Sequence, residues 1–247
     1  FVLIGDHKQL PAISLQTDEE GRISDERLTS LGITNCKQSL FERMYYRLIG
    51  MGDTACIATL YRQGRMHPEV SSFANRHFYN GQLCPVPLPH QTSTLPYNTY
   101  DKASALQALI ATHRTAFINC PVPKQEERFK TNSHEAQLCA MVVKNIIELY
   151  STNGIPYDAH QTIGIISPFR GQGALIRNEL SLLDMEEYTQ HISIDTVERY
   201  QGSQRDIIIY CTTITSPSQM ELIVEAIDPT SPIVNQPIDR KLNVALT

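Results

Sequence analysis

The chain has 247 residues, of which 41% are apolar and 19% are charged, a balance that supports a buried core and excludes wholesale disorder. Its net charge of −5 argues against a module that coats nucleic acid by charge alone, although it is compatible with a local basic groove. The sequence holds no run of about 18 apolar residues, and its first residues do not read as a signal peptide. We therefore expect no membrane partner and a cytoplasmic location, in the bacterial cytosol or nucleoid.

The first 53 residues predict a strand, a loop and a helix. Residues 1–4 are an apolar run that stops at Gly5 and Asp6, as a buried strand ending in a loop would. Because natural domains seldom begin inside a buried strand, we expect this chain to be part of a longer protein. The polar residues 14–35 are expected to form a mobile loop, and residues 39–49 carry apolar side chains at helical spacing.

The next part of the chain predicts two further strands around a helix and a surface connection. Residues 55–60 read as a strand, and a helix should run from Pro68 to about residue 79 with proline in its first turn. Residues 84–100 are rich in Pro, Thr and Ser and should form a surface connection. Residues 115–119 are expected to be another strand.

The second half alternates strands and helices. Asn132 is placed as the N-cap of a helix that reaches about Tyr150, with Glu135 in the capping-box position. Strands are expected at 162–167, 192–195 and 206–213, and a helix at 173–183. Continuous apolar strands that alternate with helices are typical of a parallel sheet covered on both faces, so the predicted fold class is α/β.

The six cysteines show no CxxC spacing, and histidines do not cluster beside them. Reduced thiols, several of them in the core, fit this spread better than a zinc site or a disulfide framework. We therefore expect no metal centre built from this chain's own cysteines.

Four loops that follow expected strands share one kind of chemistry. They are GDHKQLP at 5–11, QGRMHP at 63–68, SPFRGQ at 167–172 and the segment 196–206 around Gln201 and Gly202. Their amides, guanidinium groups and small residues suit phosphates and bases, and parallel sheets bind ligands at these strand ends. A small-molecule α/β enzyme is poorly supported, because neither a nucleophile–base pair nor a dinucleotide glycine fingerprint is present.

Taken in order, these segments resemble the motifs of superfamily 1 helicases, in the branch that contains the nonsense-mediated-decay helicase and the Dna2-type nuclease-helicases. GDHKQLP resembles motif III, QGRMHPEVSSFANRHFYNGQL resembles the QYRMHP block, and ISPFRGQ resembles the TPYRAQ block. IDTVERYQGSQRDIII resembles motif V, and RKLNVALT at 240–247 resembles the start of motif VI. Five blocks in order and at matching spacing identify the chain as a member of this family.

The resemblance implies two RecA-like motor domains that hold ATP and Mg²⁺ in the cleft between them, with single-stranded DNA or RNA across their top. Residues 1–53 would be the end of the first motor domain, and residues 54–247 the second, truncated at motif VI. The main groups that bind ATP and Mg²⁺ would lie in an absent N-terminal part. That first motor domain and the nucleic acid would be the partners of this chain.

The resemblance also implies roles for three residues in catalysis. Gln9 would sense the γ-phosphate or the attacking water, Asp6 would lie near the metal and its waters, and Arg65 would reach the γ-phosphate as an arginine finger. Plainer interpretations remain open: Asp6 could cap a turn, Gln9 could be a surface amide, and Arg65 could pair with a surface carboxylate.

The remaining candidates would contact the nucleotide or the nucleic acid. The nucleotide would meet four residues: Gly5, Gln201, Gly202 and Gln204. The nucleic-acid backbone would meet Thr196, Pro168 and Arg170. Plainer interpretations remain open here too: Gln201 and Gly202 could form an ordinary turn, and Arg170 could be a solvated charge at the start of a helix.

The sequence departs from the family pattern in two places and lacks one motif. Gly64 replaces the usual Tyr of QYRMHP, and Gln204 replaces the usual Glu of motif V. The pattern GxxxxGK[ST], which cradles phosphates in such motors, does not occur in the 247 residues. We therefore expect a helicase motor half that is inactive by itself, with a catalytically dead docking module for nucleic acid or protein as the alternative.

Overall fold

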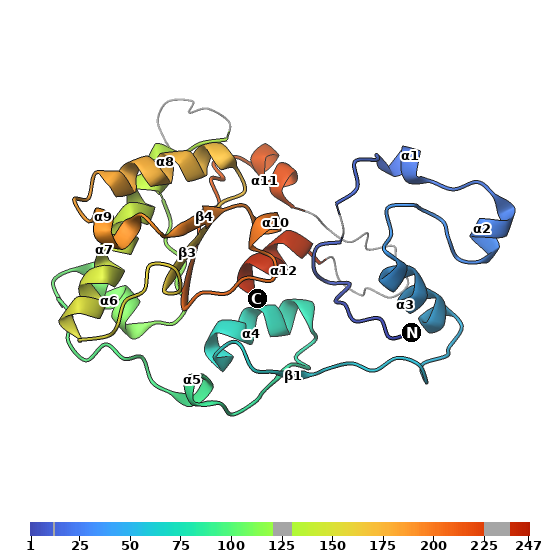
Figure 1. Ribbon diagram of the computed structural model, residues 1–247, viewed down its shortest axis with the longest axis horizontal. Coiled ribbons are helices and arrows are strands. Elements are labelled where there is room, and N and C mark those ends of the chain that lie inside the picture. Colours follow the sequence, from blue (N-terminus) through green and yellow to red (C-terminus); the bar gives the residue numbers. More distant parts are fainter. Residues whose placement is uncertain (12, 121–129, 225–237) are drawn as a thin grey trace.

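The computed structural model describes residues 1–11, 13–120, 130–224 and 238–247. Figure 1 shows the N-terminal part, coloured blue, on one side of the molecule and the main sheet with its helices on the other. The N-terminal part contains α1 (Asp18–Gly21), α2 (Glu26–Ser30) and α3 (Leu40–Gly50).

The main sheet is parallel and has three strands in the order β4-β3-β5. β3 (Ile163–Ile166) lies between β4 (Ser193–Asp195) and β5 (Ile207–Tyr210), and Ile166 at the end of β3 lies opposite Asp195. All four residues of β3 are buried, because strands pair with both of its edges and helices cover its faces. The sheet confirms the predicted α/β class with parallel strands and helices on both sides.

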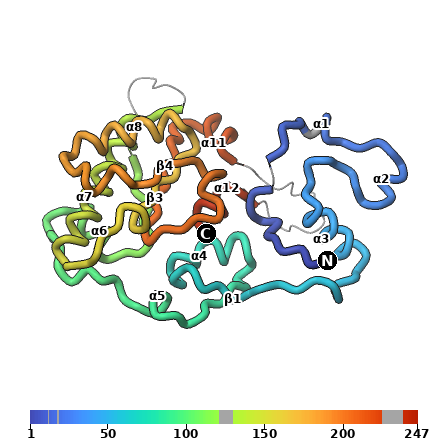
Figure 2. Tube along the Cα trace, in the orientation of Figure 1, coloured from blue at the N-terminus to red at the C-terminus, as the bar shows by residue number. Residues whose placement is uncertain are grey.

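The other elements follow in chain order. They are β1 (Arg62–Gln63), α4 (Pro68–Phe78), β2 (Cys84–Pro85), α5 (Pro89–Thr92), α6 (Ala105–Thr112), α7 (Ser133–Thr152), α8 (Arg170–Ser181), α9 (Glu186–Thr189), α10 (Val197–Tyr200), α11 (Pro217–Ile223) and α12 (Arg240–Leu246). β1 and β2 pair in parallel as a separate two-residue ladder. α12 contacts both α4 and α10 and lies between the N-terminal part and the main sheet (Figure 2).

The hydrophobic core lies where α7 and α8 pack on the main sheet. Its largest fully buried aliphatic side chains are Ile146, Leu149, Ile163, Ile165, Ile176 and Ile192. Each such side chain contributes about 1.5–3 kcal/mol when it leaves water, so this layer is the main source of stability in the described structure. Cys139 and Cys211 are buried in the same cluster, and all six cysteines are free.

Four helices predicted by periodicity and caps are confirmed. Ser39 caps α3, with its side chain accepting from the backbone N–H of Glu42, and α4 begins at Pro68 as expected. α8 begins at Arg170, three residues before its predicted start. α7 begins after Asn132, whose side chain accepts from the backbone N–H of Glu135 at 3.1 Å.

Only half of the predicted capping box at α7 is present. The Glu135 carboxylate does not turn back to the N-cap; it accepts hydrogen bonds from the backbone N–H groups of Thr212 at 2.7 Å and Thr213 at 2.8 Å. The carboxylate therefore joins the first turn of α7 to the chain that leaves β5. Burial raises the pKa of the Glu135 carboxyl, although these amides favour its charged form.

Three predicted strands are wrong. Residues 1–4 form no strand and are exposed, Phe1 fully so, and residues 55–60 and 115–119 form none either. An apolar run becomes a strand only where a neighbouring backbone pairs with it, and the described residues offer these segments no such neighbour. The pairing near residue 60 falls instead on β1 and β2.

Short helices appear where loops were expected. Residues 14–35 contain α1, α2 and an isolated bridge between Arg22 and Asn35, and residues 84–100 contain β2 and α5. The helices α6, α11 and α12 were not anticipated either. No helix in the described ranges is long and apolar enough to cross a membrane.

Candidate functional site

The loop 5–11 is folded around the carboxylate of Asp6. Its Oδ1 accepts from the backbone N–H of Lys8 at 2.9 Å, and the backbone N–H of Gln9 donates to the Asp6 carbonyl at 3.2 Å. This is an Asx turn, so Asp6 does cap a turn, as its plainer interpretation holds. Its other oxygen, Oδ2, accepts from the Tyr79 hydroxyl at 2.6 Å.

The same loop is held by contacts from distant parts of the chain. The Lys8 ammonium donates to the Phe78 carbonyl at 2.6 Å, at the end of α4. The side-chain amide of Asn243, on α12, donates to the Lys8 carbonyl at 2.8 Å. The Gln201 amide donates to the Leu10 carbonyl at 3.2 Å. The GDHKQLP loop thus meets residues of the QYRMHP-like block at 63–83 and of the motif V and motif VI segments.

A cavity of about 330 Å³ lies beside this loop. It is lined by Gly5, Asp6, His7, Gln9, Leu10, Pro11, Ser39, Phe41, Glu42 and Gln201. Four of the residues singled out by the sequence therefore line one space, three from the loop and Gln201 from after α10. Burial lowers the pKa of His7, whose ring stacks on Tyr45 at 4.5 Å between centroids.

Packing against α3, rather than the approach of a ligand, accounts for a glycine at position 5. A Cβ on Gly5 would come within 3.0 Å of the Phe41 ring, so its absence allows α3 to pack against the loop. The acidic groups of the cavity are also engaged. Asp6 is held by Lys8 and Tyr79, and Glu42 forms an ion pair with Arg240.

This lining fits an edge of a nucleotide better than it fits a metal ion. The Gln201 amide donates one N–H to Leu10 and retains a second, and the Gln9 amide can likewise donate to a phosphate oxygen, whereas both carboxylates are committed to partners within the chain. The described residues contain no cluster of three or more His, Cys, Asp or Glu that could hold a metal.

Arg65 does not line this cavity. It lies before α4, is exposed, and donates from Nη1 to the Thr247 carbonyl at 2.9 Å. The loop 5–11 instead contacts the other end of α4, whose 11 residues span about 16 Å. Gln9 and Arg65 are therefore not brought together directly, and Arg65 lies exposed at the surface.

The backbone around Arg65 is rigidly hydrogen-bonded. The Gln63 Oε1 accepts from the backbone N–H groups of Arg65 at 3.2 Å and Met66 at 2.8 Å. The buried Gln91 amide donates to the carbonyls of Gln63 and Met66, at 3.0 and 2.8 Å. A Cβ on Gly64 would come within 3.3 Å of the end of the Leu88 side chain, so a larger residue here would require that leucine to shift.

Thr196, Pro168 and Arg170 lie together at the carboxyl edge of the main sheet. They follow β4 and β3, which are neighbours, and the backbone N–H of Ser167 donates to the Asp195 carbonyl at 3.0 Å. Arg170 is exposed as the first residue of α8. The expectation that strand-end loops gather at one edge is met for these three residues.

Gly202 and Gln204 lie outside the cavity. Gly202 has a φ of +83° and no atom within 4 Å of a Cβ position, so its role in this structure is the turn itself. Gln204 is exposed, and its carbonyl accepts from the Arg205 guanidinium at 2.6 Å. Within the described residues, no hydrogen bond joins the Gln204 side chain to the other candidates.

Residue-by-residue reading of the sequence missed several groups that build the site. Tyr79 and Asn243 hold Asp6 and Lys8, and Gln172 is fully buried, with its amide bonded to the backbone N–H of Asn132 at 2.7 Å and the carbonyl at 2.9 Å. All three lie inside the quoted motif blocks. Because their hydrogen-bond partners lie far away in the sequence, no local pattern indicates their role. Only their position inside a helicase-like motif segment could have pointed to them.

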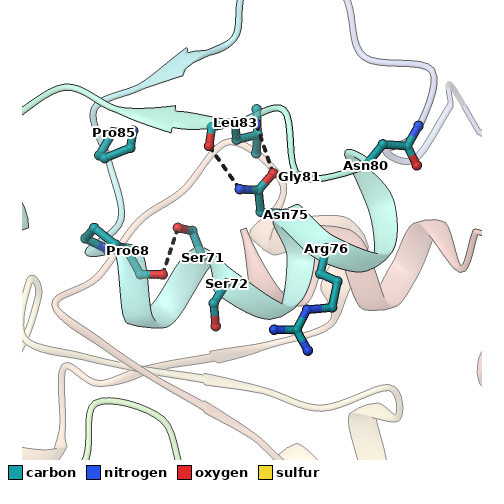
Figure 3. A pocket seen from close by; sticks show the side chains of 9 residues that line it. All are labelled: Pro68, Ser71, Ser72, Asn75, Arg76, Asn80, Gly81, Leu83 and Pro85. Carbon is teal, nitrogen blue, oxygen red and sulfur yellow. Dashed lines mark hydrogen bonds between the residues drawn. The ribbon is translucent and has the colours of Figure 1, made fainter.

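A second hollow, of about 550 Å³, lies over α4 and β2 (Figure 3). In it the Asn75 side chain bonds both the N–H and the carbonyl of Leu83, at 2.9 Å each, while Arg76 projects from the opposite side of the helix. None of the residues singled out by the sequence lines this hollow. It therefore adds nothing to the candidate nucleotide cavity.

Comparison with known families decides which kind of domain this is. The model of a family described as AAA domain matches residues 36–247. The chain belongs to this AAA domain family. The match covers the cavity's α3 side, the main sheet and α12, and it supports a RecA-like, P-loop NTPase-type fold for this AAA domain.

The relatives of this AAA domain include several helicases. It is 29% identical over its whole length to Regulator of nonsense transcripts 1 of Dictyostelium discoideum, and 27% identical over its whole length to ATP-dependent helicase upf1 of Schizosaccharomyces pombe. It is 27% identical over 85% of its length to DNA replication ATP-dependent helicase/nuclease JHS1 of Arabidopsis thaliana. These matches support the resemblance to superfamily 1 helicases of this branch. The chain spans only 16%, 22% and 14% of these relatives, respectively.

Proposed function

We propose that the chain forms the second motor half of an ATP-dependent helicase that acts on DNA or RNA. Residues 1–53 would belong to the first motor domain and residues 54–247 to the second. The observation that carries the proposal is the cavity of about 330 Å³ that gathers Gly5, Asp6 and Gln9 with Gln201. The ATP-dependent helicases among its relatives support it.

In this proposal the chain's residues act by position and charge. The amides of Gln9 and Gln201 would hold the terminal phosphates of ATP at the rim of the cavity. Arg65 would leave the Thr247 carbonyl, a single exposed hydrogen bond, and bring its planar guanidinium to the γ-phosphate. ATP with its Mg²⁺ would supply the phosphoryl group, and most of its binding groups would come from the first motor domain.

Translocation would use the carboxyl edge of the main sheet. There Thr196, Pro168 and Arg170 lie at the ends of neighbouring strands and would contact the backbone of single-stranded nucleic acid. Arg170 is exposed and can reach a phosphate, which gives the local positive charge that the overall charge of −5 does not supply. The nucleic acid and the first motor domain are the proposed partners.

The test replaces Arg65 in the complete polypeptide that carries this chain. We expect Arg65→Ala to lower the kcat of nucleic-acid-stimulated ATP hydrolysis by about 1,000-fold, the usual contribution of an arginine finger. Arg177→Ala, which removes an exposed guanidinium from α8, is the matched control and should leave kcat unchanged. The assay should be run with both single-stranded DNA and single-stranded RNA.

The outcomes separate the proposal from its alternative. Hydrolysis by the complete polypeptide that survives Arg65→Ala would overturn the finger role, and the absence of any hydrolysis would favour a docking module. The 247-residue chain alone should hydrolyse no ATP, since it contains no GxxxxGK[ST] segment. Magnesium-dependent hydrolysis by that chain would contradict this part of the proposal.

A further inference from the structure

Three segments that are far apart in the sequence meet around one buried amide. Asn243, on α12, is 0% exposed, and its Nδ2 donates to the Lys8 carbonyl at 2.8 Å and to the Tyr79 hydroxyl at 3.0 Å. Lys8 belongs to the loop 5–11, and Tyr79 follows the last residue of α4. The Lys8 ammonium in turn donates to the Phe78 carbonyl and lies 5.2 Å from the centre of the Tyr79 ring.

The chemistry of these groups fixes the direction of every hydrogen bond in the cluster. A carbonyl only accepts, so the Asn243 amide must face Lys8 with its NH₂ group. The same NH₂ donates to the Tyr79 oxygen, which leaves the hydroxyl proton free to point at Asp6 Oδ2, 2.6 Å away. Burial, followed by the neighbouring Asp6, raises the pKa of Tyr79, so this hydroxyl keeps its proton at physiological pH.

The hydrogen bonds continue from Asn243 toward Arg65. The Thr247 hydroxyl donates to the Asn243 carbonyl at 2.7 Å, and the Thr247 carbonyl accepts from Arg65 Nη1 at 2.9 Å. The two proposed catalytic elements do not touch, yet both are bonded to the same helix. One end of α12 is next to Arg65, and its middle carries Asn243, which bonds Lys8 and the tyrosine that donates to Asp6.

We infer that Tyr79 and Asn243 are positioning residues, which hold the loop 5–11 against α4 and α12 and so set the placement of Asp6 and Gln9 in the cavity. This inference rests on the proposed function, because it assigns a purpose to the geometry of that cavity. Neither side chain lines the cavity, so each acts through the loop. A change in α12 would therefore reach the Asp6 carboxylate through two hydrogen bonds.

The test removes one hydroxyl and leaves the ring that packs against the buried cluster of Ala74, Phe78 and Ile238. Tyr79→Phe in the complete polypeptide should lower kcat for ATP hydrolysis about tenfold while KM for ATP stays within about twofold, as expected when a positioning contact is lost. Amide hydrogen exchange, measured without nucleotide, should become faster in residues 5–11 and remain unchanged in α7 and α8. In an Asp6→Ala background, Tyr79→Phe should have no further effect on kcat.

Tyr157→Phe is the matched control, since Tyr157 also donates one hydroxyl hydrogen bond, to the Tyr188 carbonyl at 3.0 Å on another face of the fold. It should change neither kcat nor the exchange of residues 5–11. Unchanged exchange in Tyr79→Phe would overturn the inference, and so would faster exchange with an unchanged kcat. If the wild-type polypeptide hydrolysed no ATP, the proposed function would fail and positioning for catalysis with it, while the exchange measurement would still decide whether Tyr79 holds the loop.

Discussion

Gly202 illustrates how a single residue of a motif can be required by the backbone alone. Its φ of +83° lies in the left-handed region that residues with a Cβ rarely adopt, and no atom lies within 4 Å of its Cβ position. Space is therefore available, and only the dihedral angle favours glycine. The close approach to a nucleotide that the family implies for this residue remains a proposal.

We expect Gly202→Ala to destabilise the protein by about 1–2 kcal/mol, because alanine must be held in a strained conformation. Denaturant unfolding at constant pH measures the change. Gly50→Ala is the matched control: Gly50 also has nothing within 4 Å but has no positive φ, and it ends a helix. That variant should be neutral or slightly stabilising. Equal losses in both variants would show that the turn at Gly202 is not strained by a side chain.

Asp6 and Arg65 show which contacts a local sequence pattern can predict and which it cannot. The turn made by Asp6 is local, so a pattern of loop residues could predict it. The bond from Tyr79 to Asp6 spans 73 positions and could not be read from either segment. The position of Arg65 relative to Gln9 was likewise beyond the sequence, because it depends on how α4 lies between them.

At the scale of elements, the Glu135 carboxylate links the start of α7 to the chain that follows β5. It lies in the first turn of α7 and accepts from the backbone just beyond β5, where Thr213 has a φ of 58°. The chain therefore leaves the sheet in a fixed direction toward α11. The capping-box pattern predicted the start of α7 correctly. The Glu135 carboxylate, however, accepts from the backbone N–H groups of Thr212 and Thr213 instead of the backbone N–H of the N-cap residue.

The raised pKa of Glu135 predicts a pH dependence of stability. Burial lifts the native-state pKa above the ordinary value of 4.5, so the native state binds this proton more tightly than the unfolded state. The corresponding stability is fully present below the unfolded-state pKa and is lost as pH rises through the native-state pKa. We expect the difference in unfolding free energy between wild type and Glu135→Gln to fall as pH rises above about 4.5 and then to level off.

Urea unfolding of both proteins between about pH 4 and pH 8 measures this difference. Glu221→Gln, which removes an exposed carboxylate from α11, controls for the loss of one negative charge. A difference between wild type and Glu135→Gln that rises with pH, or that does not vary, would contradict the expected sign.

At the scale of the whole molecule, a buried ion pair joins the N-terminal part to the rest. The Arg240 guanidinium at the start of α12 pairs with the Glu42 carboxylate of α3, and their side chains are only 14% and 6% exposed. Glu42 also accepts from the N-cap of α3. A pair so far from water contributes little by itself, but removing one partner leaves a buried charge alone.

We expect Arg240→Met to destabilise the protein by about 3 kcal/mol, since Glu42 would keep its charge without a cation. Adding Glu42→Gln should restore part of that loss, because glutamine keeps the bond to the cap of α3 without the charge. Denaturant unfolding of the two single variants and the double variant gives the coupling between the positions. Strictly additive losses would show that the two side chains do not act as a pair.

The sequence by itself determined the features that depend on near neighbours. Apolar periodicity and caps gave α3, α4, α7 and α8, and continuous apolar runs gave the three strands of the main sheet. The order of the motif blocks gave the helicase resemblance, which the AAA domain match supports. These signals persist in a single sequence because helices, caps and turns form between residues a few positions apart.

Only the tertiary structure decided which distant segments share a site. Residues 1–4, 55–60 and 115–119 form no strand in the structure. A strand requires a neighbouring backbone to pair with, and the sequence of the segment itself does not indicate whether one is present. The tertiary structure also placed Asn243 beside Lys8, across 235 positions, and separated Arg65 from Gln9 along α4. Such contacts depend on how whole helices pack, and the packing is set by the shape and burial of many side chains together rather than by any local pattern.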